Sequence, residues 1–416
     1  MTRELLRRTT TLLATAGILL TTAVVTPSAS AGESAAVSLD TARFASFNTS
    51  LNRSNEGELV QDLSTPDDQQ AANVAEIIQR TRPEVILINE FDFDADGTAL
   101  QLFQDNYLSV PHNGAAAIEY PYAFTAPSNT GVPSGFDLNN DGTVGGPEDA
   151  FGFGFFPGQY GMAVYSMHPI DTAAVRTFQT FLWKDMPGAL LPDDPSTPEP
   201  ADYYSPKELD VFRLSSKSHW DLPIQVGGDT VHFLVSHPTP PVFDGEEDRN
   251  GRRNFDEIGF WADYVSPLRG RYIYDDAGAR GGLGFGELFV IAGDQNSDPF
   301  DGDSIPGAAQ QLLDHRRVND SRPPDSLGGI HASLRQGGIN GEHEGPARLD
   351  TADFSDTEPG NLRVDYVLPS TQINIRSSAV FWPTPHSPLF RLTGDGNFPF
   401  PSSDHRLVWA DLRIPG

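Results

Sequence analysis

Eight polar side chains in this sequence stand at or beside short apolar runs that have the length of β-strands. They are amides, carboxylates and imidazoles, and in chain order they are Asn48, Glu90, His237, Asp294, Asn296, Asp365, Asp404 and His405. Carboxylate and amide oxygens suit hard divalent cations, and imidazoles beside carboxylates can act as acids, bases or charge-stabilising groups. One such residue alone is usually a turn former or a structural histidine, so the prediction of a site depends on the ordered set.

A second pattern is DLNNDGTVGGPE, residues 137–148, which has the spacing of a calcium-binding loop. Gly142 is at position 6, and oxygen donors fall at positions 1, 3, 5, 7 and 12, which are Asp137, Asn139, Asp141, Thr143 and Glu148. An EF-hand needs a helix on each side, but Pro, Ser and Gly precede this loop and glycines follow it. We therefore expect Ca²⁺ to brace a long surface loop. The alternative is an Asx-turn loop that binds no metal.

The elements that position these residues are short strands with helices between some of them. Runs of strand length bounded by turn residues occur at Thr41–Phe47, Glu84–Asn89, Met162–Ser166, Val231–Ser236, Leu288–Ala292, Arg363–Leu368, Ala379–Trp382 and Arg406–Leu412. Helical periodicity predicts helices over Gln69–Arg80 and Asn254–Val265. This mixture predicts a layered α/β domain. Two stretches rich in Gly, Pro or Asp, 122–157 and 185–205, are interpreted as inserted surface loops.

The N-terminal segment has the pattern of a secretory signal peptide. Basic residues come first, an apolar run covers residues 12–25, and Ala29-Ser30-Ala31 follows. We expect residues 1–31 to be removed and the mature protein, 32–416, to be secreted as one extracellular domain; a membrane anchor is the alternative. The chain has no cysteine, so disulfides cannot stabilise it, and its net charge is −29.

Several blocks together resemble the endonuclease/exonuclease/phosphatase superfamily, which has the deoxyribonuclease I-like fold. They occur in the order typical of that family and are FASFNTS, VILINEFD, YGMAVYSMHPI, FLVSHPTP, IAGDQNSD, RVDYVLPS and SSDHRLV. Members of the family often carry Gln before the glutamate, whereas Asn89 precedes Glu90 here. The resemblance implies a four-layered α/β sandwich of two mixed β-sheets flanked by helices, and we interpret the chain as a secreted, actinobacterial-type member.

The resemblance also implies a metal-dependent phosphoester hydrolase. Asn48, Glu90 and Asp404 are expected to hold a catalytic Mg²⁺ or Mn²⁺, or else Ca²⁺. Such an ion would polarise a phosphoryl oxygen and offset the charge that develops on it.

The remaining residues of the set receive roles in the attack on phosphorus. Asp294 is expected to orient or deprotonate a water, and Asn296 to donate a hydrogen bond to the phosphate. His405 would be held in one tautomer by Asp365, and His237 is assigned to the phosphate by analogy.

Basic residues outside this set are open to two interpretations. Arg252 or Arg253, in a densely charged stretch after the His237 strand, would either contact the substrate phosphate or pair with neighbouring acids. Arg213 and Lys217 would either form a phosphate-attracting patch or lie on a strand surface.

A phosphatase or phosphodiesterase is the function that these observations favour, acting as a monomer without stable membrane insertion. The acidic charge and the absence of a basic stripe favour small phosphoesters over nucleic acid. A secreted nuclease is one alternative, and a catalytically silent binding protein is another. A sphingomyelinase-like phospholipase C is a third, and it would need exposed aromatic residues near the site, for which Phe398 and Phe400 are candidates.

Overall fold

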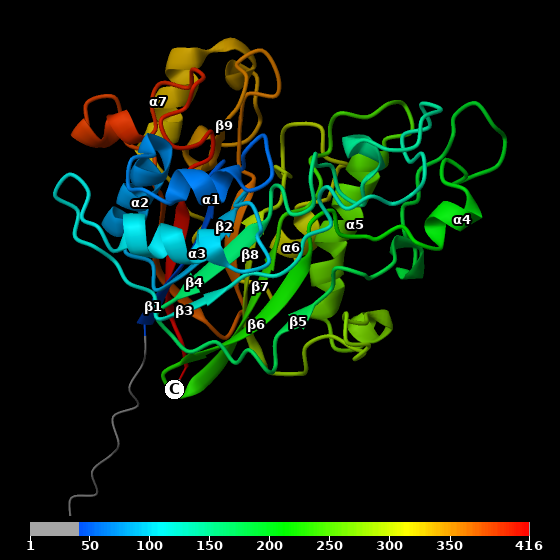
Figure 1. Ribbon diagram of the computed structural model, residues 1–416, viewed down its shortest axis with the longest axis horizontal. Coiled ribbons are helices and arrows are strands. Elements are labelled where there is room, and N and C mark those ends of the chain that lie inside the picture. The colour runs from blue at the N-terminus through cyan, green and yellow to red at the C-terminus, as the bar shows by residue number, and fades with distance from the viewer. Residues whose placement is uncertain (1–40, 416) are drawn as a thin grey trace, which may run out of the picture. The chain divides into compact units, whose positions relative to one another are not determined.

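Two β-sheets form the centre of the part of the chain that the structure describes, residues 41–415 of a computed structural model (Figure 1). The expected signal peptide, residues 1–31, lies outside the described residues. The strands of the first sheet are β1 (Thr41–Asn48), β2 (Val85–Asn89), β3 (Tyr122–Phe124), β4 (Met162–Ser166), β12 (Asn374–Val380) and β13 (Val408–Arg413). They are arranged in the order β12-β13-β1-β2-β4-β3.

The second sheet has five strands in the order β11-β8-β7-β6-β5. Its strands are β5 (Arg176–Thr177), β6 (His219–Val226), β7 (Asp229–Ser236), β8 (Leu288–Asp294) and β11 (Asp365–Pro369). Both sheets are mixed, because β1 and β2 are parallel, β7 and β8 are parallel, and the other pairs are antiparallel. A separate pair consists of β9 (Ala352–Asp353) and β10 (Asn361–Leu362).

Helices cover the outer faces of the two sheets. Figure 1 shows α1 to α3 on one side and α5 on the other. The α-helices are α1 (Glu58–Leu63), α2 (Gln69–Thr81), α3 (Thr98–Phe103), α4 (Pro206–Leu209), α5 (Arg249–Tyr264), α6 (Gln310–Leu313) and α7 (Leu327–Gln336). The shorter turns are a π-helix at Gln104–Leu108 and 3₁₀ helices at Pro147–Asp149, Trp183–Asp185, Arg269–Tyr272, Gly338–Gly341, Ala347–Leu349 and Pro388–Leu392. Within residues 41–415, no helix has the length and apolar character that crossing a bilayer requires.

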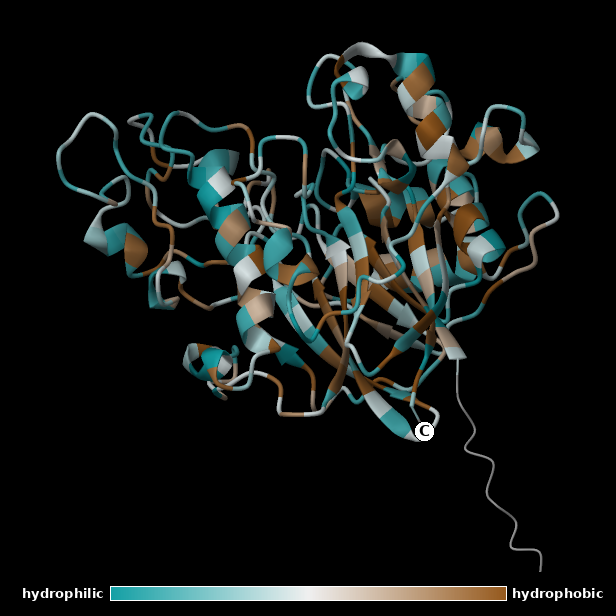
Figure 2. Cartoon of the chain, turned by 180° about the vertical axis from the view of Figure 1, so that it is seen from behind, coloured by the Kyte–Doolittle hydropathy of each residue, from teal (hydrophilic) through white to brown (hydrophobic). Residues whose placement is uncertain are grey.

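Strand alternation divides the apolar side chains among three buried layers. In β1, Phe44 packs into the cluster between the sheets, whereas Phe47 packs against the helices α1 to α3. In β7, Phe233 belongs to the cluster between the sheets and Leu234 to the cluster under α5. Successive strand residues point to opposite faces, so each strand supplies two apolar layers. Hydrophobic colouring accordingly gathers on the strands between the helices (Figure 2). The result is the expected four-layered α/β sandwich.

The predicted elements agree closely with the observed ones. Each of the eight predicted strands and both predicted helices overlaps an observed element, with ends that differ by up to five residues. The overlap is smallest for 379–382, which shares only two residues with β12. Helix α2 begins where the Asp68 side chain accepts a hydrogen bond from the Ala71 backbone N–H at 2.7 Å. It ends at Thr81, because the next residue, Arg82, has a φ of 55° and precedes a proline.

The long strand β6 was not among the predicted strands. Pro223 lies in its middle, and proline within an apolar run is a signal against a central strand. In the structure β7 pairs with the whole of β6, but on the other side β5 pairs only with Trp220 and Asp221. Beyond them that side has an isolated bridge from Ile170 to Ile224, where the Pro223 carbonyl accepts the Asp171 N–H at 2.9 Å, so Pro223 lies where the ladder is short.

Candidate active site

The eight strand-end residues all lie at one end of the two sheets. Because β1 and β2 are parallel, Asn48 at the end of β1 is beside Glu90, which follows β2. In the second sheet, His237 follows β7, and Asp294 ends the parallel strand β8. Asp365 begins β11 directly opposite Asp294 in the antiparallel register.

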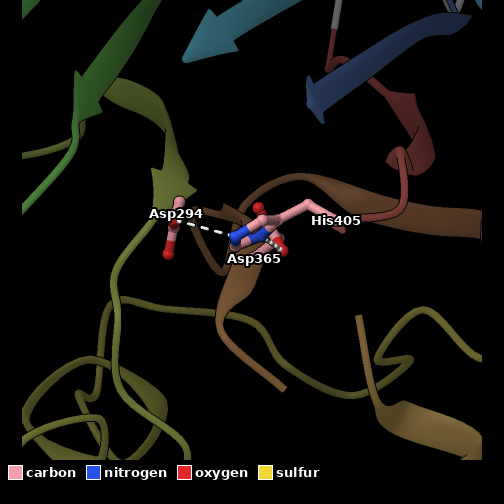
Figure 3. Close-up of side chains that lie close together, drawn as sticks. All are labelled: Asp294, Asp365 and His405. Atoms are coloured by element: carbon pink, nitrogen blue, oxygen red, sulfur yellow. Dashed lines mark hydrogen bonds and ion pairs between the residues drawn. The ribbon is translucent and has the colours of Figure 1, made fainter. Parts of the chain in front are cut away.

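Asp294, Asp365 and His405 form a buried charged triad, shown in Figure 3. Nδ1 of His405 is 2.9 Å from Oδ2 of Asp365, and its Nε2 is 3.6 Å from Oδ2 of Asp294. Burial acts to lower the pKa of His405, but the charges of Asp365 and Asp294 outweigh it and raise the pKa well above its usual value. His405 is therefore an imidazolium between two carboxylates. Thr351 fixes the outer carboxylate, since its hydroxyl donates to Oδ2 of Asp365 at 2.8 Å.

One carboxylate oxygen, Oδ2 of Asp294, lies close to several other side chains of the site. Oδ2 of Asp294 accepts a hydrogen bond from Nδ2 of Asn48 at 3.1 Å and lies 3.4 Å from Nε2 of His237. The other oxygen, Oδ1, accepts the backbone N–H of Asn296 at 2.8 Å. Burial raises the pKa of Asp294 to about 6, against the opposing effect of His405. Burial, together with the charges of Lys217 and His405, lowers the pKa of His237 well below its usual value. His237 is therefore a neutral imidazole, unlike His405.

Glu90 and Asp404 form a second pair of carboxylates, and both are partly exposed. Oε1 of Glu90 accepts a hydrogen bond from Asn48 at 3.1 Å, and Oδ1 of Asp404 accepts one from the Ser50 hydroxyl at 3.0 Å. Burial and the charge of Asp404 raise the pKa of Glu90 to about 7. Glu90, whose ionisation is disfavoured by burial and by the charge of Asp404, forms with Asp404 and the Asn48 amide a partly exposed donor set suited to a hard divalent cation.

The triad is a second place where a cation could be considered, because ligand atoms of Asp294, Asp365 and His405 lie within 4.8 Å of one another. However, the imidazolium of His405 already supplies the positive charge there, and Oδ2 of Asp365 is engaged by both His405 and Thr351. Within residues 41–415, Glu90 and Asp404 form no ion pair with a basic side chain, although the charges of His405 and Lys217 reach Glu90. We therefore regard Glu90 and Asp404 as the better metal position.

Lys217 is a residue whose place in the site the sequence left open. Its side chain is 7% exposed and makes no hydrogen bond or ion pair within residues 41–415. Burial lowers its pKa, and the nearby charges of Glu257, Glu90 and Asp294 act in the opposite direction. Lys217 is thus a buried cation facing the carboxylates and His237, and of the two interpretations above it fits the phosphate-attracting one.

The neighbouring arginines are structural. Arg253 is 7% exposed, and its guanidinium donates to the backbone carbonyls of Leu214, Phe151 and Arg213 at 2.7, 2.5 and 2.9 Å. Arg213 donates to Oδ1 of Asn129 at 2.6 Å and lies over the Phe151 ring. Both side chains are therefore committed to holding loops together, and the interpretation of Arg253 as a phosphate ligand is not supported.

Two further contacts refine the expectations from sequence. Asn89, which stands where the family often has Gln, accepts the Asp294 backbone N–H at 3.3 Å, so it supports the site from the neighbouring sheet. The aromatic ring against His405 is Phe354, at 5.3 Å between ring centroids. Phe398, considered above as a pocket residue, is 87% exposed and has Phe400 as its ring neighbour at 6.5 Å.

The 137–148 loop is closed by hydrogen bonds between its side chains and its own backbone. Asp137 accepts the amides of Asp141 and Gly142 at 3.1 and 2.8 Å, and Asp141 accepts the amide of Thr143 at 2.8 Å. Glu148 at position 12 lies 3.8 Å from Arg249 instead of turning into the loop. The residues at positions 1, 3 and 5 are therefore together, and the one at position 12 is turned outward.

The chain belongs to the endonuclease/exonuclease/phosphatase family, whose model matches residues 45–405. Solved structures with a similar fold include an endonuclease/exonuclease/phosphatase from Beutenbergia cavernae DSM 12333, with 16% identity, coverage of 91% of this chain and 72% of that chain, and a TM-score of 0.48. A mannosyl-6-phosphatase from Bacteroides thetaiotaomicron VPI-5482 has 12% identity, coverage of 90% and 100%, and a TM-score of 0.44. The beta toxin of Staphylococcus aureus has 16% identity, coverage of 89% and 99%, and a TM-score of 0.42. Among curated proteins, none matches this sequence significantly.

Proposed function

We propose that this protein is a secreted, metal-dependent phosphoester hydrolase that acts as a phosphatase or phosphodiesterase. The observation that carries the proposal is the set of side chains around one carboxylate oxygen, Oδ2 of Asp294. Asn48, His237 and His405 approach this one oxygen at 3.1, 3.4 and 3.6 Å, and they come from both sheets. A family of phosphoester hydrolases provides the chemical context, and the signal-peptide pattern of residues 1–31 supports secretion.

The residues proposed to hold the catalytic cation are Glu90 and Asp404, with Asn48 beside them. Bound there, Mg²⁺ or Mn²⁺ would supply Lewis-acid polarisation of a phosphoryl oxygen. The raised pKa of Glu90 supports this assignment, because a cation between the two carboxylates would relieve their repulsion.

Asp294 is proposed to hold the attacking water in line with phosphorus. Its carboxylate is kept in place by the Asn48 amide and the Asn296 backbone N–H, which leaves its orientation fixed before substrate arrives. As the water attacks, its proton passes toward Asp294, and the ester oxygen leaves on the opposite side of phosphorus.

The two histidines have different proposed tasks because their charges differ. His405, kept positive by Asp365 and Asp294, stabilises the negative charge on the phosphoryl oxygens. His237, kept neutral beside Lys217, donates a hydrogen bond to the phosphate. Lys217 adds a buried positive charge that favours a phosphate over neutral ligands.

The first experiment is hydrolysis of p-nitrophenyl phosphate, bis(p-nitrophenyl) phosphate and plasmid DNA by the purified protein, each with Mg²⁺, Mn²⁺, Ca²⁺ or a chelator. Metal-dependent turnover of a small ester with intact plasmid is expected. Plasmid cleavage would identify a secreted nuclease, and turnover of sphingomyelin alone would identify a phospholipase C. Asp294→Ala and His405→Ala should each abolish turnover without loss of fold, and near-normal activity in either would refute the assignment.

The metal position has its own test. Glu90→Gln and Asp404→Asn are expected to raise the Mn²⁺ dissociation constant at least tenfold, measured by electron paramagnetic resonance of free Mn²⁺. Glu84→Gln, a partly exposed glutamate that ion-pairs with His168, is the control and should bind Mn²⁺ like the wild type. Unchanged binding in both site variants would move the metal to another position.

We also propose that the 137–148 loop binds a structural Ca²⁺ and braces the 122–157 insertion. The support is the spacing of its oxygen donors and the closeness of Asp137, Asn139 and Asp141. Binding would require Glu148 to leave Arg249 and turn inward. Millimolar Ca²⁺ should raise the melting temperature of the wild type but not of Asp137→Ala, whereas Glu199→Ala in the other insertion should respond like the wild type. An equal Ca²⁺ response in all three would remove the proposal.

A further inference from the structure

The loop 151–160, FGFGFFPGQY, presents aromatic rings to solvent from a backbone that is closely packed. Phe153 and Phe155 are 46% and 66% exposed, and their ring centroids are 5.6 Å apart. Tyr160 continues the row, with its ring 6.5 Å from that of Phe153. We refer to Phe153, Phe155 and Tyr160 as the aromatic row. Large apolar side chains gathered in this way at a surface usually mark a binding site.

Glycines explain why the phenylalanines point outward. A Cβ atom on Gly152 would lie 1.8 Å from the Ser216 carbonyl oxygen, and one on Gly154 would lie 2.7 Å from the Gly131 nitrogen. Positions 152 and 154 therefore have no room for a side chain on the inner face of the loop, and the rings at 153 and 155 lie on its outer face. The exposure of the rings is thus built into the backbone.

Hydrogen bonds fix the loop in this position. The Phe155 N–H donates to Oε1 of Gln159 at 2.8 Å, and Nε2 of Gln159 donates to the Arg53 carbonyl at 2.7 Å. The Phe151 N–H donates to the Val132 carbonyl at 2.9 Å. A rigid backbone loses little conformational entropy when a ligand binds, which favours a preformed binding surface.

Both ends of the loop adjoin the candidate active site. The Phe91 N–H, one residue after Glu90, donates to the Gly161 carbonyl at 3.1 Å, so Tyr160 lies beside the proposed metal ligand. At the other end, Gly152 packs against Ser216, the neighbour of Lys217. The aromatic row therefore borders the position expected for the phosphate.

From this geometry we infer that the aromatic row is a substrate subsite that stacks a planar aromatic ring in the esterified group. The inference rests on the proposed function, because it places the ring relative to a phosphate bound between Lys217 and the cation proposed at Glu90. Phe153 and Phe155 carry no polar atom on their side chains, so they offer apolar faces and no hydrogen bonds to a ring. The planes of Phe153 and Phe155 meet at 82°, so one ring can lie flat against a planar group while the other contacts its edge. A compact cation is instead recognised by rings that surround it. The ring can belong to a nucleobase or to an aryl group.

The test compares substrates that differ only in the ring. Benzyl phosphate is paired with cyclohexylmethyl phosphate, and adenosine 5′-phosphate with ribose 5-phosphate, each as the monoester and as its methyl diester. The wild type is expected to have a lower KM for the aromatic member of a pair. The double variant Phe153→Ala/Phe155→Ala should raise that KM about tenfold with little change in kcat, and leave the non-aromatic member unchanged. Preference for the adenosine pair would indicate a nucleobase, and preference for the benzyl pair an aryl group.

Phe285→Ala is the matched control, because Phe285 is 76% exposed and lies on a different loop. Its KM values should equal those of the wild type, and both variants should melt at the wild-type temperature. Equal KM effects on the aromatic and non-aromatic members, or no effect of the double variant, would overturn the inference.

Equilibrium dialysis separates a failure of this inference from a failure of the proposed function. If the wild type hydrolyses none of the esters but binds adenosine 5′-phosphate more tightly than ribose 5-phosphate, and the double variant loses this difference, the subsite stands and the hydrolase proposal fails. If turnover occurs and the two ligands bind equally to wild type and variant, the hydrolase proposal stands and the subsite is refuted.

Discussion

His405 and Asp365 are joined by a buried hydrogen bond of 2.9 Å between Nδ1 and Oδ2. Asp365 begins β11, and His405 pairs with Ala352 of β9 in an isolated bridge, so the contact ties the small β9-β10 pair to the second sheet. The bond engages Nδ1 of the imidazole, so the other ring nitrogen, Nε2, is left to point toward Asp294. One contact thus serves the fold and the chemistry together.

Replacement of Asp365 by asparagine should lower kcat about 10²–10³-fold. The amide keeps the shape but removes the charge that holds His405 protonated, and positioned acid–base groups typically contribute 10²–10⁴-fold. Steady-state kinetics with a small phosphoester measures the effect. The control is Asp411→Asn, which breaks the partly exposed Arg43–Asp411 ion pair on β13 and should leave kcat within twofold. A wild-type kcat for Asp365→Asn would show that His405 needs no anionic partner.

Lys217→Met should lower kcat/KM for phosphoesters about 10- to 100-fold while the protein stays folded. The ammonium group has no hydrogen-bond partner within residues 41–415, so methionine removes its charge without leaving a broken pair, and it fills a similar volume. Exposed Lys207, at the start of α4, provides the control as Lys207→Met. An unchanged kcat/KM would mean that Lys217 serves only to offset the buried carboxylates around it.

Arg253→Met should destabilise the fold by about 3–5 kcal/mol, because three backbone carbonyls and the nearby Glu257 lose a buried cation. Urea unfolding followed by tryptophan fluorescence gives the free energy. Arg252→Met, at the adjacent and more exposed position, should change it by about 0.5 kcal/mol or less. The reverse order, with loss of activity and normal stability in Arg253→Met, would restore Arg253 as a phosphate ligand.

The strands and the ordered polar set could be predicted from sequence because both are local signals. Apolar runs such as Met162–Ser166 are bounded by turn residues, and Asp294 or Asp365 stands at a fixed place relative to its strand. The four-layer arrangement needed the family resemblance, since periodicity does not say which strands meet.

Contacts between distant segments could not be predicted in the same way. Arg253 has the sequence context of a charged loop, and only the packing of α5 on residues 151 and 213–214 shows its bonds to backbone carbonyls. The metal-loop pattern at 137–148 gives the spacing of its donors, but not that Glu148 lies near Arg249. Strand β6 was missed because Pro223 is a local signal against a central strand. The proline is tolerated because β6 is paired along its whole length only with β7, and its pairing on the other side is short.

His219 supports a prediction about stability and pH that does not involve the active-site carboxylates. This buried ring lies 3.0 Å from the Ser215 hydroxyl through Nδ1 and 2.9 Å from the Glu257 carbonyl through Nε2. Burial lowers its pKa to about 4, against an opposing effect of Glu257. The folded state therefore holds a neutral ring, whereas the unfolded chain binds a proton near pH 6.5. Between these two values the unfolded state carries more protons, so this group's contribution to stability is present above pH 6.5 and is lost as the pH falls toward 4.

The free energy of unfolding should thus fall by about 2 kcal/mol between pH 7.5 and pH 5 through His219 alone. Other buried acids, such as Asp92 and Asp256, have raised pKa values and act in the opposite direction, so the comparison must be made with a variant. His219→Gln keeps a donor for the Glu257 carbonyl but cannot be protonated. It should be less stable than the wild type at pH 7.5, and the gap should narrow by about 2 kcal/mol at pH 5. Exposed His386→Gln should follow the wild type at both pH values. A gap of constant size in urea unfolding at the two pH values would show that His219 does not titrate differently in the folded and unfolded states.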